Sequence, residues 1–187
     1  MTATTTTSDT TTSSSTTANA HFPLAGLTND GWSTDKEATA TCYCGAVQLA
    51  FPTHPPGLTN TFICHCTDCH KITASMFATN FIIQDPYLKH LRGKETLTQY
   101  SQSKTTVSGK AMTNFFCSVC GSLMYRTSEV FPGHSILRTG TVDDFHLHET
   151  RLRPRMEVFT KDRVRWLCAV EGVVQVEGVP DDTTTST

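Results

Sequence analysis

Seven of the eight cysteines in this 187-residue chain fall into three tight groups. They are Cys42 and Cys44 in a C-x-C pattern, Cys64, Cys66 and Cys69 in C-x-C-x-x-C, and Cys117 and Cys120 in C-x-x-C. The amino-terminal sequence lacks the charged start and apolar core of a secretory signal, so we expect a cytoplasmic protein whose thiols stay reduced. The grouping therefore favours metal binding over a framework of disulfides.

The motif FFCSVCGS, residues 115–122, predicts half of a structural zinc site. Zinc–sulfur bonds of about 2.3 Å in a tetrahedron place ligand sulfurs roughly 3.8 Å apart, and a tight C-x-x-C turn meets that spacing. Gly121 can adopt positive φ and let the turn close. In TCYCGA the two cysteines start up to about 7 Å apart, and Gly45 makes the required bend easier. Together the two pairs supply the four thiolates that a structural zinc needs.

The stretch FICHCTDCHK, residues 62–71, offers three cysteine ligands and leaves a fourth position open. Three protein ligands with an open position are typical of catalytic zinc, where water or substrate is the fourth ligand. His65 or His70 could instead close the site, although in a strand His65 would point away from its cysteine neighbours. Another grouping, in which Cys42 and Cys44 join part of the triplet, also stays open.

Three residues beside this triplet are candidates for catalytic roles. His65 and His70 titrate in a useful range for moving protons. Lys71 would neutralise the centre, because three thiolates on one Zn²⁺ leave a net charge of about −1. Such a metal suits a thiolate or an enolate-like oxygen as its fourth ligand, and hence thiol addition or elimination, isomerisation or decarboxylation.

Later charged segments are weaker candidates. The acids Asp143 and Asp144 could orient a substrate, and the arginines of RLRPR could bind a carboxylate through forked hydrogen bonds. These arginines are Arg151, Arg153 and Arg155. Acids and arginines in loops are more often solvated surface. The remaining cysteine, Cys168, is expected to be a buried thiol.

Short segments rich in β-branched and aromatic residues predict a mainly β protein. They are residues 40–51, 59–64, 76–83, 96–101, 110–117, 122–128, 134–142, 155–160 and 164–170. Residues 85–93 are expected to form one helical turn that ends at Gly93. The Thr/Ser-rich ends, residues 1–21 and 180–187, predict disordered tails around one domain at 22–179. With a formal net charge of −2 and no apolar run of membrane-spanning length, we expect neither nucleic acid nor a membrane as partner.

The blocks CYCGAV, CHCTDCHK and FFCSVCGS resemble, in this order, the three cysteine blocks of the glutathione-dependent formaldehyde-activating enzyme family, to which centromere protein V is also similar. The resemblance runs from about Ala38 to Val176 and includes the weaker segments GTVDDF and VRWL. It implies an Mss4-like fold of small antiparallel sheets, with a structural zinc on the first and third blocks and a second, labile zinc on the middle block. One departure is Glu157, near a position where the family often has a histidine.

The family's activity joins glutathione to formaldehyde and is classed as a carbon–sulfur lyase. The resemblance therefore implies an enzyme with two Zn²⁺ ions per chain that acts on a small molecule such as a glutathione or other thiol adduct. An alternative is a zinc-dependent isomerase, decarboxylase or dehydratase in a metabolite biosynthetic pathway. A third reading is a non-enzymatic zinc module that binds a protein partner, and a metal closed by His70 would favour it.

Overall fold

The computed structural model describes residues 19–180, and β-strands dominate its regular structure, which confirms the mainly β prediction. The strands are β1 (Glu37–Thr41), β2 (Gln48–Pro52), β3 (Leu58–Cys64), β4 (Ala78–Gln84), β5 (Lys89–Arg92), β6 (Leu97–Gln102), β7 (Met112–Cys117), β8 (Leu123–Ser128), β9 (Phe131–Arg138), β10 (Met156–Val158) and β11 (Val174–Val176). The helices are α1 (Thr67–Thr73) and α2 (His146–Glu149), and the 3₁₀ turns are η1 (Asp85–Tyr87), η2 (Lys94–Thr96), η3 (Thr139–Thr141) and η4 (Thr160–Asp162).

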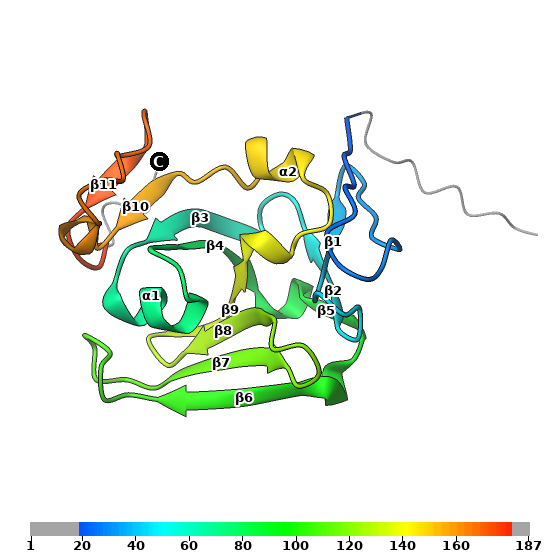
Figure 1. Cartoon of the computed structure of the whole chain (residues 1–187), viewed down its shortest axis with the longest axis horizontal. Coiled ribbons are helices and arrows are strands. Elements are labelled where there is room, and N and C mark those ends of the chain that lie inside the picture. The colour runs from blue at the N-terminus through cyan, green and yellow to red at the C-terminus, as the bar shows by residue number, and fades with distance from the viewer. Residues whose placement is uncertain (1–18, 181–187) are drawn as a thin grey trace, which may run out of the picture.

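The strands form two sheets (Figure 1). The smaller sheet has the order β1-β2-β5, and the larger one has the order β11-β10-β3-β4-β9-β8-β7-β6. Pairing is antiparallel except at β10, which runs parallel to both β3 and β11. The larger sheet is thus more extensive than the small antiparallel sheets expected, and it is partly parallel.

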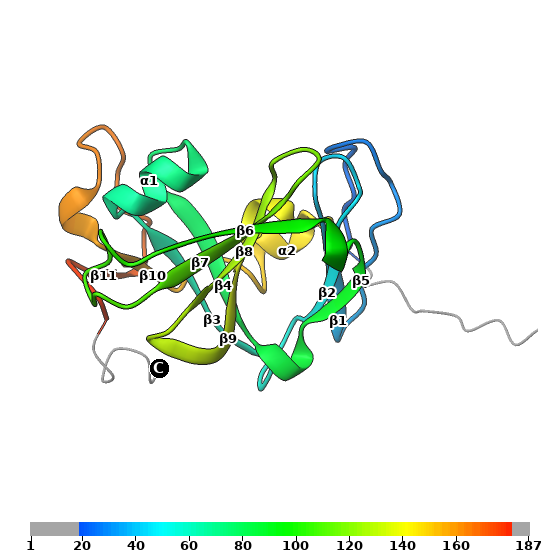
Figure 2. The ribbon, with the colours of Figure 1, turned by 90° about the horizontal axis from the view of Figure 1, so that it is seen from below.

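The main hydrophobic core lies between these two sheets. Phe51 of β2 and Phe81 of β4 are fully buried, and their ring centroids are 4.7 Å apart. The small sheet lies at one end of the molecule, whereas α1, β10 and β11 lie at the opposite end (Figures 1 and 2). A second, smaller cluster includes Phe62, Ile136 and Met156, and it also contains cysteines of β3 and α1.

Two local predictions are wrong. Residues 164–170 form turns and irregular chain instead of a strand, and β11 follows only at Val174. Residues 85–93 contain a 3₁₀ turn and then strand β5, because this segment pairs with β2 and completes the small sheet. Gly93 ends that strand with a φ of 71°, and a Cβ there would come within 2.0 Å of the carbonyl oxygen of Ala46.

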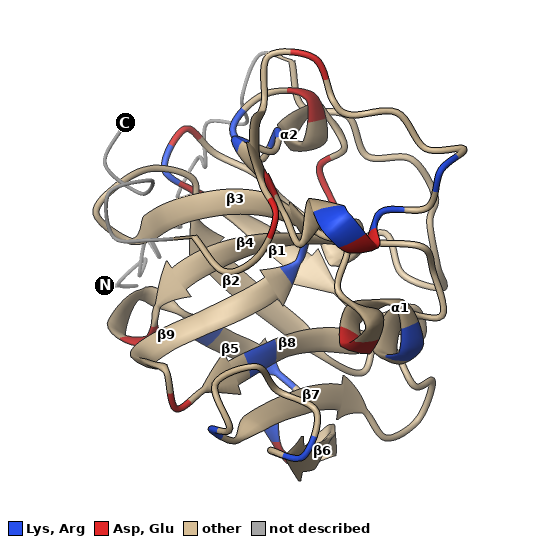
Figure 3. Ribbon diagram, turned by 90° about the vertical axis from the view of Figure 1, so that its left-hand side faces the viewer, with Lys and Arg blue, Asp and Glu red and all other residues tan. Residues whose placement is uncertain are grey.

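The predicted disordered tails lie almost wholly outside the described residues, 19–180. The backbone N–H of His21 donates a hydrogen bond of 2.8 Å to the carboxylate of Asp144, so residue 21 already belongs to the folded domain. In the described part of the chain, no helix is long and apolar enough to cross a membrane. Basic and acidic residues are interspersed over the face shown in Figure 3.

Candidate metal centres

The first and third cysteine groups come together and form what we call the four-cysteine cluster. It consists of Cys42, Cys44, Cys117 and Cys120, whose sulfur atoms all lie within 4.8 Å of one another. The sulfur of Cys44 lies 3.6 Å from that of Cys42 and 3.8 Å from that of Cys117, close to the spacing of roughly 3.8 Å in a zinc tetrahedron. The alternative grouping with the middle triplet is therefore not the one that the structure shows.

Two turns hold the four-cysteine cluster, one between β1 and β2 and the other between β7 and β8. Gly45 and Gly121 adopt φ of 81° and 75°, so each turn closes through a conformation that favours glycine. The hydroxyl of Ser122 accepts a 3.0 Å hydrogen bond from the backbone N–H of Tyr43, which ties one turn to the other. Burial raises the pKa of Cys42 to about 12. Burial also raises the pKa of Cys120, but hydrogen bonds with Ser122 and Cys44 outweigh burial and lower that pKa to about 6.

The middle group forms the three-cysteine cluster, namely Cys64, Cys66 and Cys69, with all three sulfurs within 4.8 Å of one another. Cys64 ends β3, and Cys66 caps the following helix by accepting a 3.4 Å hydrogen bond from the backbone N–H of Cys69. One helical turn then brings Cys69 beside the other two. The sulfurs of Cys64 and Cys66 are 3.4 Å apart. A strand end, a cap and a first helical turn thus aim three thiols at one point.

No histidine, aspartate or glutamate among residues 19–180 brings a ligand atom within 4.8 Å of all three of these sulfurs. His65 faces the other way, as strand alternation predicts, and its Nε2 lies 3.0 Å from Oε2 of Glu157. His70 lies on α1 with its Nε2 buried and without a hydrogen-bond partner in the described structure. Lys71 is exposed on the same helix. The protein therefore offers three thiols and an open fourth direction, a donor set that suits Zn²⁺.

Glu157 is the centre of a buried network beside the three-cysteine cluster. It is 1% exposed, and its carboxylate accepts hydrogen bonds from His65, from Nη1 of Arg163 at 2.6 Å and from the backbone N–H of Val170 at 2.7 Å. Burial raises the pKa of Glu157, but these donors outweigh burial and hold the pKa below its ordinary value. The sequence did not indicate this network, because its members come from three separate segments.

Two buried arginines also adjoin the three-cysteine cluster, and sequence analysis missed them. Arg126 of β8 is 8% exposed and donates from Nη1 to the sulfur of Cys69 at 3.7 Å. Arg138, at the end of β9, is 6% exposed and donates from Nη1 to Oδ1 of Asn80. Hydrogen bonds with Cys64 and Cys66, and the charges of the two arginines, lower the pKa of Cys69. The available signal was alternation, which puts Arg138 on the same face of its strand as the apolar Ile136.

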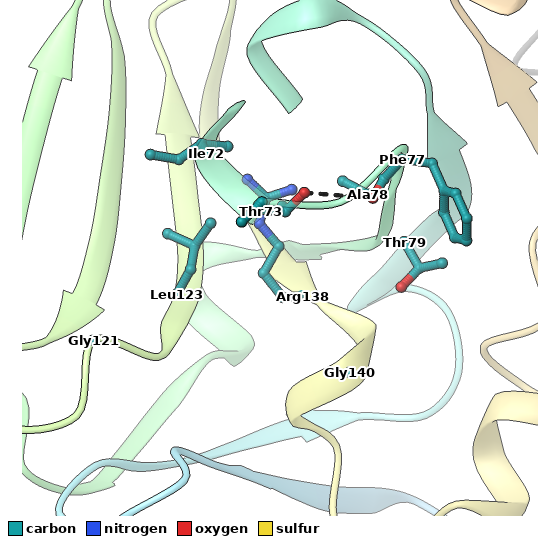
Figure 4. Close-up of a pocket in the computed structure, with 10 residues that line it drawn as sticks. Ile72, Thr73, Phe77, Ala78, Thr79, Gly121, Leu123, Arg138 and Gly140 are labelled. Carbon is teal, nitrogen blue, oxygen red and sulfur yellow. Dashed lines mark hydrogen bonds between the residues drawn. The ribbon is translucent and has the colours of Figure 1, made fainter. Parts of the chain in front are cut away.

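A pocket of about 430 Å³ opens beside Arg138. It lies between α1, the start of β4 and the β7–β8 turn, and its walls include Ile72, Phe77 and Leu123. Figure 4 shows the Arg138 side chain reaching from β9 toward Thr73, with Ile72 and Leu123 on one side and Phe77 on the other. The pocket adjoins the three-cysteine cluster, since α1 continues from Cys69 and Ala78 pairs with Cys64 across β3 and β4.

The family model described as glutathione-dependent formaldehyde-activating enzyme matches residues 37–162, from β1 to η4. This chain belongs to that family. A comparison with curated proteins found no match. Among solved structures, the crystal structure of a Rhodobacter sphaeroides protein aligns with a TM-score of 0.42 and 21% identity, over 55% of this chain and 85% of that chain.

In this member of the glutathione-dependent formaldehyde-activating enzyme family, Asp143 and Asp144 of the GTVDDF segment make structural hydrogen bonds to segments distant in sequence. The carboxylate of Asp144 is fully buried and accepts from the backbone N–H groups of His21 and His146. Asp143 accepts a 2.7 Å hydrogen bond from the hydroxyl of Thr41, and burial raises the pKa of Asp143. These contacts join the first described segment to the loop before α2.

The arginines of RLRPR and the eighth cysteine lie at the surface. Arg151, Arg153 and Arg155 are all exposed in the loop that leads to β10. Cys168 is exposed as well, so the expectation of a buried thiol is wrong. Cys168 is exposed because residues 164–170 do not pair as a strand in a sheet. The neighbouring Trp166 is 72% exposed for the same reason.

Proposed function

We propose that this chain is a zinc enzyme of the carbon–sulfur lyase type that acts on a thiol adduct of a small carbonyl compound, with glutathione as the first thiol to test. The observation that carries this proposal is the three-cysteine cluster, which offers three convergent thiols beside a pocket and, among residues 19–180, no fourth protein ligand. The family model supports it, because its description names glutathione and formaldehyde. The eight free thiols fit a reducing, cytoplasmic compartment.

A zinc ion on these thiolates would bind the substrate thiol in its fourth position and lower the pKa of that thiol. In the forward direction a carbon–sulfur bond forms between the thiol sulfur and the carbonyl carbon, and the thiol proton ends on the carbonyl oxygen. The reverse reaction breaks the same bond. The buried and unpartnered Nε2 of His70 is our candidate for moving that proton. His65 would fix the direction of its two cysteine neighbours, and Lys71 would add positive charge near the anionic centre.

The four-cysteine cluster would hold the second zinc ion in a structural role. Its four sulfurs lie within 4.8 Å of one another, and a zinc ion bound to all four would have no open position for a substrate, because zinc prefers four ligands. In this proposal the four-cysteine cluster stabilises the fold, and the three-cysteine cluster binds the substrate.

Cobalt substitution tests the open position directly. Thiolate-bound Co²⁺ absorbs visible light, and its spectrum changes when a fourth ligand arrives. We expect glutathione to change the spectrum of cobalt-loaded protein, and we expect this change to disappear in Cys66→Ser and to persist in the matched surface variant Cys168→Ser. A cobalt spectrum that already shows four ligands and that changes in His70→Ala would overturn the proposal, leaving a protein-binding zinc module as the better account.

The reaction is tested with glutathione and formaldehyde. Exchange NMR of the zinc-loaded protein should show faster formation and breakdown of the hydroxymethyl thioether than buffer alone. Cys66→Ser should lower that acceleration by about 100-fold, whereas Cys168→Ser should keep it. If thiol binding is intact but neither formaldehyde nor other small aldehydes react, the lyase reading fails. An isomerase, decarboxylase or dehydratase acting at the same metal would then be the function to test.

A further inference from the structure

A row of polar side chains crosses the larger sheet beneath α1. Strand pairing places Arg138 opposite Asn80, and it places Arg126 opposite Ile136, two residues before Arg138. Residues opposite one another, or two apart in one strand, share a face of the sheet. Asn114 pairs with Arg126 and continues the row onto β7. Cys64 lies on this same face, because its partner Ala78 is two residues before Asn80.

Several polar atoms in this row are buried and have no hydrogen-bond partner in the described structure. They are Nε and Nη2 of Arg138, Nε of Arg126 and Oδ1 of Asn114. None of the ion pairs within residues 19–180 involves Arg126 or Arg138. Arg126 and Arg138 both lie beside the thiols of the three-cysteine cluster, but part of each guanidinium group is left without an acceptor in the described structure. Burying a charge without enough counter-charge is costly, so these remaining donors call for a further anion.

The charges of the site indicate how much negative charge is missing. Three thiolates with one Zn²⁺ carry a net charge of about −1, while Arg126 and Arg138 together carry two positive charges. The sulfur of Cys69 already accepts from Arg126. One positive charge therefore remains without compensation, which a monoanion would supply and a phosphate dianion would exceed.

The pocket shows what kind of anion fits. Arg138 is the charged residue of its lining, and Ile72, Phe77 and Leu123 supply apolar walls (Figure 4). A volume of about 430 Å³ lies in the range of small-molecule sites. We propose that this pocket binds a carboxylate with an apolar body, held by Arg138, and that the substrate of the adjacent metal site is such an acid. The second half of this inference rests on the proposed function, whereas carboxylate binding does not.

Calorimetry with a matched pair of probes tests the binding. We expect zinc-loaded protein to bind phenylacetate about 10-fold or more tightly than its neutral isostere phenylacetamide, because charge-assisted hydrogen bonds discriminate by that order. Arg138→Gln should remove the preference, and Arg138→Lys should retain part of it because the charge remains. Arg151→Gln, which removes an exposed arginine, should leave it unchanged. Equal binding of acid and amide, or no binding of phenylacetate at millimolar concentration, overturns the proposal.

Two further measurements separate this inference from the proposed function. Phenylacetate should bind cobalt-loaded protein without changing the visible spectrum, because its carboxylate rests on Arg138 and not on the metal. A changed spectrum together with binding that survives Arg138→Gln would place the acid on the metal and overturn the inference. Inorganic phosphate should bind more weakly than phenylacetate, and the opposite order would overturn the choice of a carboxylate. A failure of glutathione to change the cobalt spectrum bears on the proposed function alone.

Discussion

Glu157 is a buried residue that positions the chain at the three-cysteine cluster without contacting its thiols. Strand β10 inserts between β3 and β11 and places Glu157 opposite Ile63, so its carboxylate lies on the far side of β3 from the thiols. There it binds His65, whose chain neighbours are two members of the three-cysteine cluster. A buried carboxylate is tolerated because three donors satisfy it. Glu157 thus serves as the buried polar partner of His65.

Replacing this carboxylate should destabilise the protein. In Glu157→Gln, the buried His65 and the half-buried Arg163 lose their shared anionic partner, and we expect the free energy of unfolding to fall by about 2–4 kcal/mol. Urea denaturation of zinc-loaded protein measures this loss. The matched control is Glu149→Gln at an exposed position, which should change the free energy by less than about 0.5 kcal/mol. Equal stability of the two variants would contradict the assigned network.

The same variant predicts a pH dependence. Because the folded-state pKa of Glu157 lies below the ordinary value of 4.5, its ionised form stabilises the fold above that pH. This contribution is lost as pH falls through the lowered folded-state pKa. We therefore expect the stability difference between wild type and Glu157→Gln to be constant near neutrality and to shrink below about pH 4.5. A difference that grows on acidification would show that the direction of the shift is wrong.

Among the elements, two turns and one strand end carry most of the geometric constraint. The β1–β2 and β7–β8 turns meet at the four-cysteine cluster, and the end of β5 lies against the chain that enters β2. The four-cysteine cluster joins the small sheet to the larger one, and its turns also pack against the main hydrophobic core. Backbone conformation at Gly45, Gly93 and Gly121 therefore adds to hydrophobic packing at this end of the molecule.

Gly93 and Gly109 form a matched pair for testing the strand end. Both have positive φ, 71° and 67°, but a Cβ at residue 93 would meet a carbonyl oxygen at 2.0 Å, while a Cβ at residue 109 would meet nothing within 4 Å. Gly109→Ala should cost about 1 kcal/mol through its backbone conformation alone. Gly93→Ala should cost about 3 kcal/mol or more, because backbone must also move. Equal losses in thermal denaturation would contradict a close approach at Gly93.

Cysteine replacements should separate the two clusters. Cys117→Ser removes one thiol of the four-cysteine cluster, which joins turns distant in sequence. If this cluster holds the proposed structural zinc, its binding is coupled to folding, so we expect a large loss of thermal stability. Cys66→Ser removes one thiol of the three-cysteine cluster, whose members all lie within one strand–helix junction. We therefore expect this variant to fold and to lose less thermal stability than Cys117→Ser. Thermal unfolding at fixed zinc concentration measures both. Similar losses in both variants would count against a division into structural and catalytic sites.

For the whole molecule, the sequence was informative where spacing alone decides the outcome. The grouping of the cysteines and most of the strands were predictable, because the residues concerned are close in sequence or alternate with period two. Arg126 and Arg138 were not, since an arginine in a strand usually indicates a solvent-facing side chain. The segment around Trp166 has strand-like composition, yet it forms turns, because strand propensity depends strongly on the packing that the folded protein provides.

Metal content tests the molecule as a whole. We expect elemental analysis of protein produced with adequate zinc to give about two zinc ions per chain, since two separate groups of thiols can each hold one. A chelator should remove one ion readily, because three ligands and an open position hold a metal less firmly than four. The second should leave only as the protein unfolds. A single tightly held ion, or two ions lost together, would contradict this assignment.

The separation of 73 residues between Cys44 and Cys117 has a consequence for synthesis on the ribosome. The thiols of the three-cysteine cluster emerge almost together, so they can capture a metal ion while the rest of the chain is still being made. The four-cysteine cluster must wait until the β7–β8 turn has left the exit tunnel, and closing so long a loop costs more entropy than closing a short one. Until then Cys42 and Cys44 form only half of the four-cysteine cluster. The three-cysteine cluster is complete earlier in synthesis, so it would compete with this half-site for zinc.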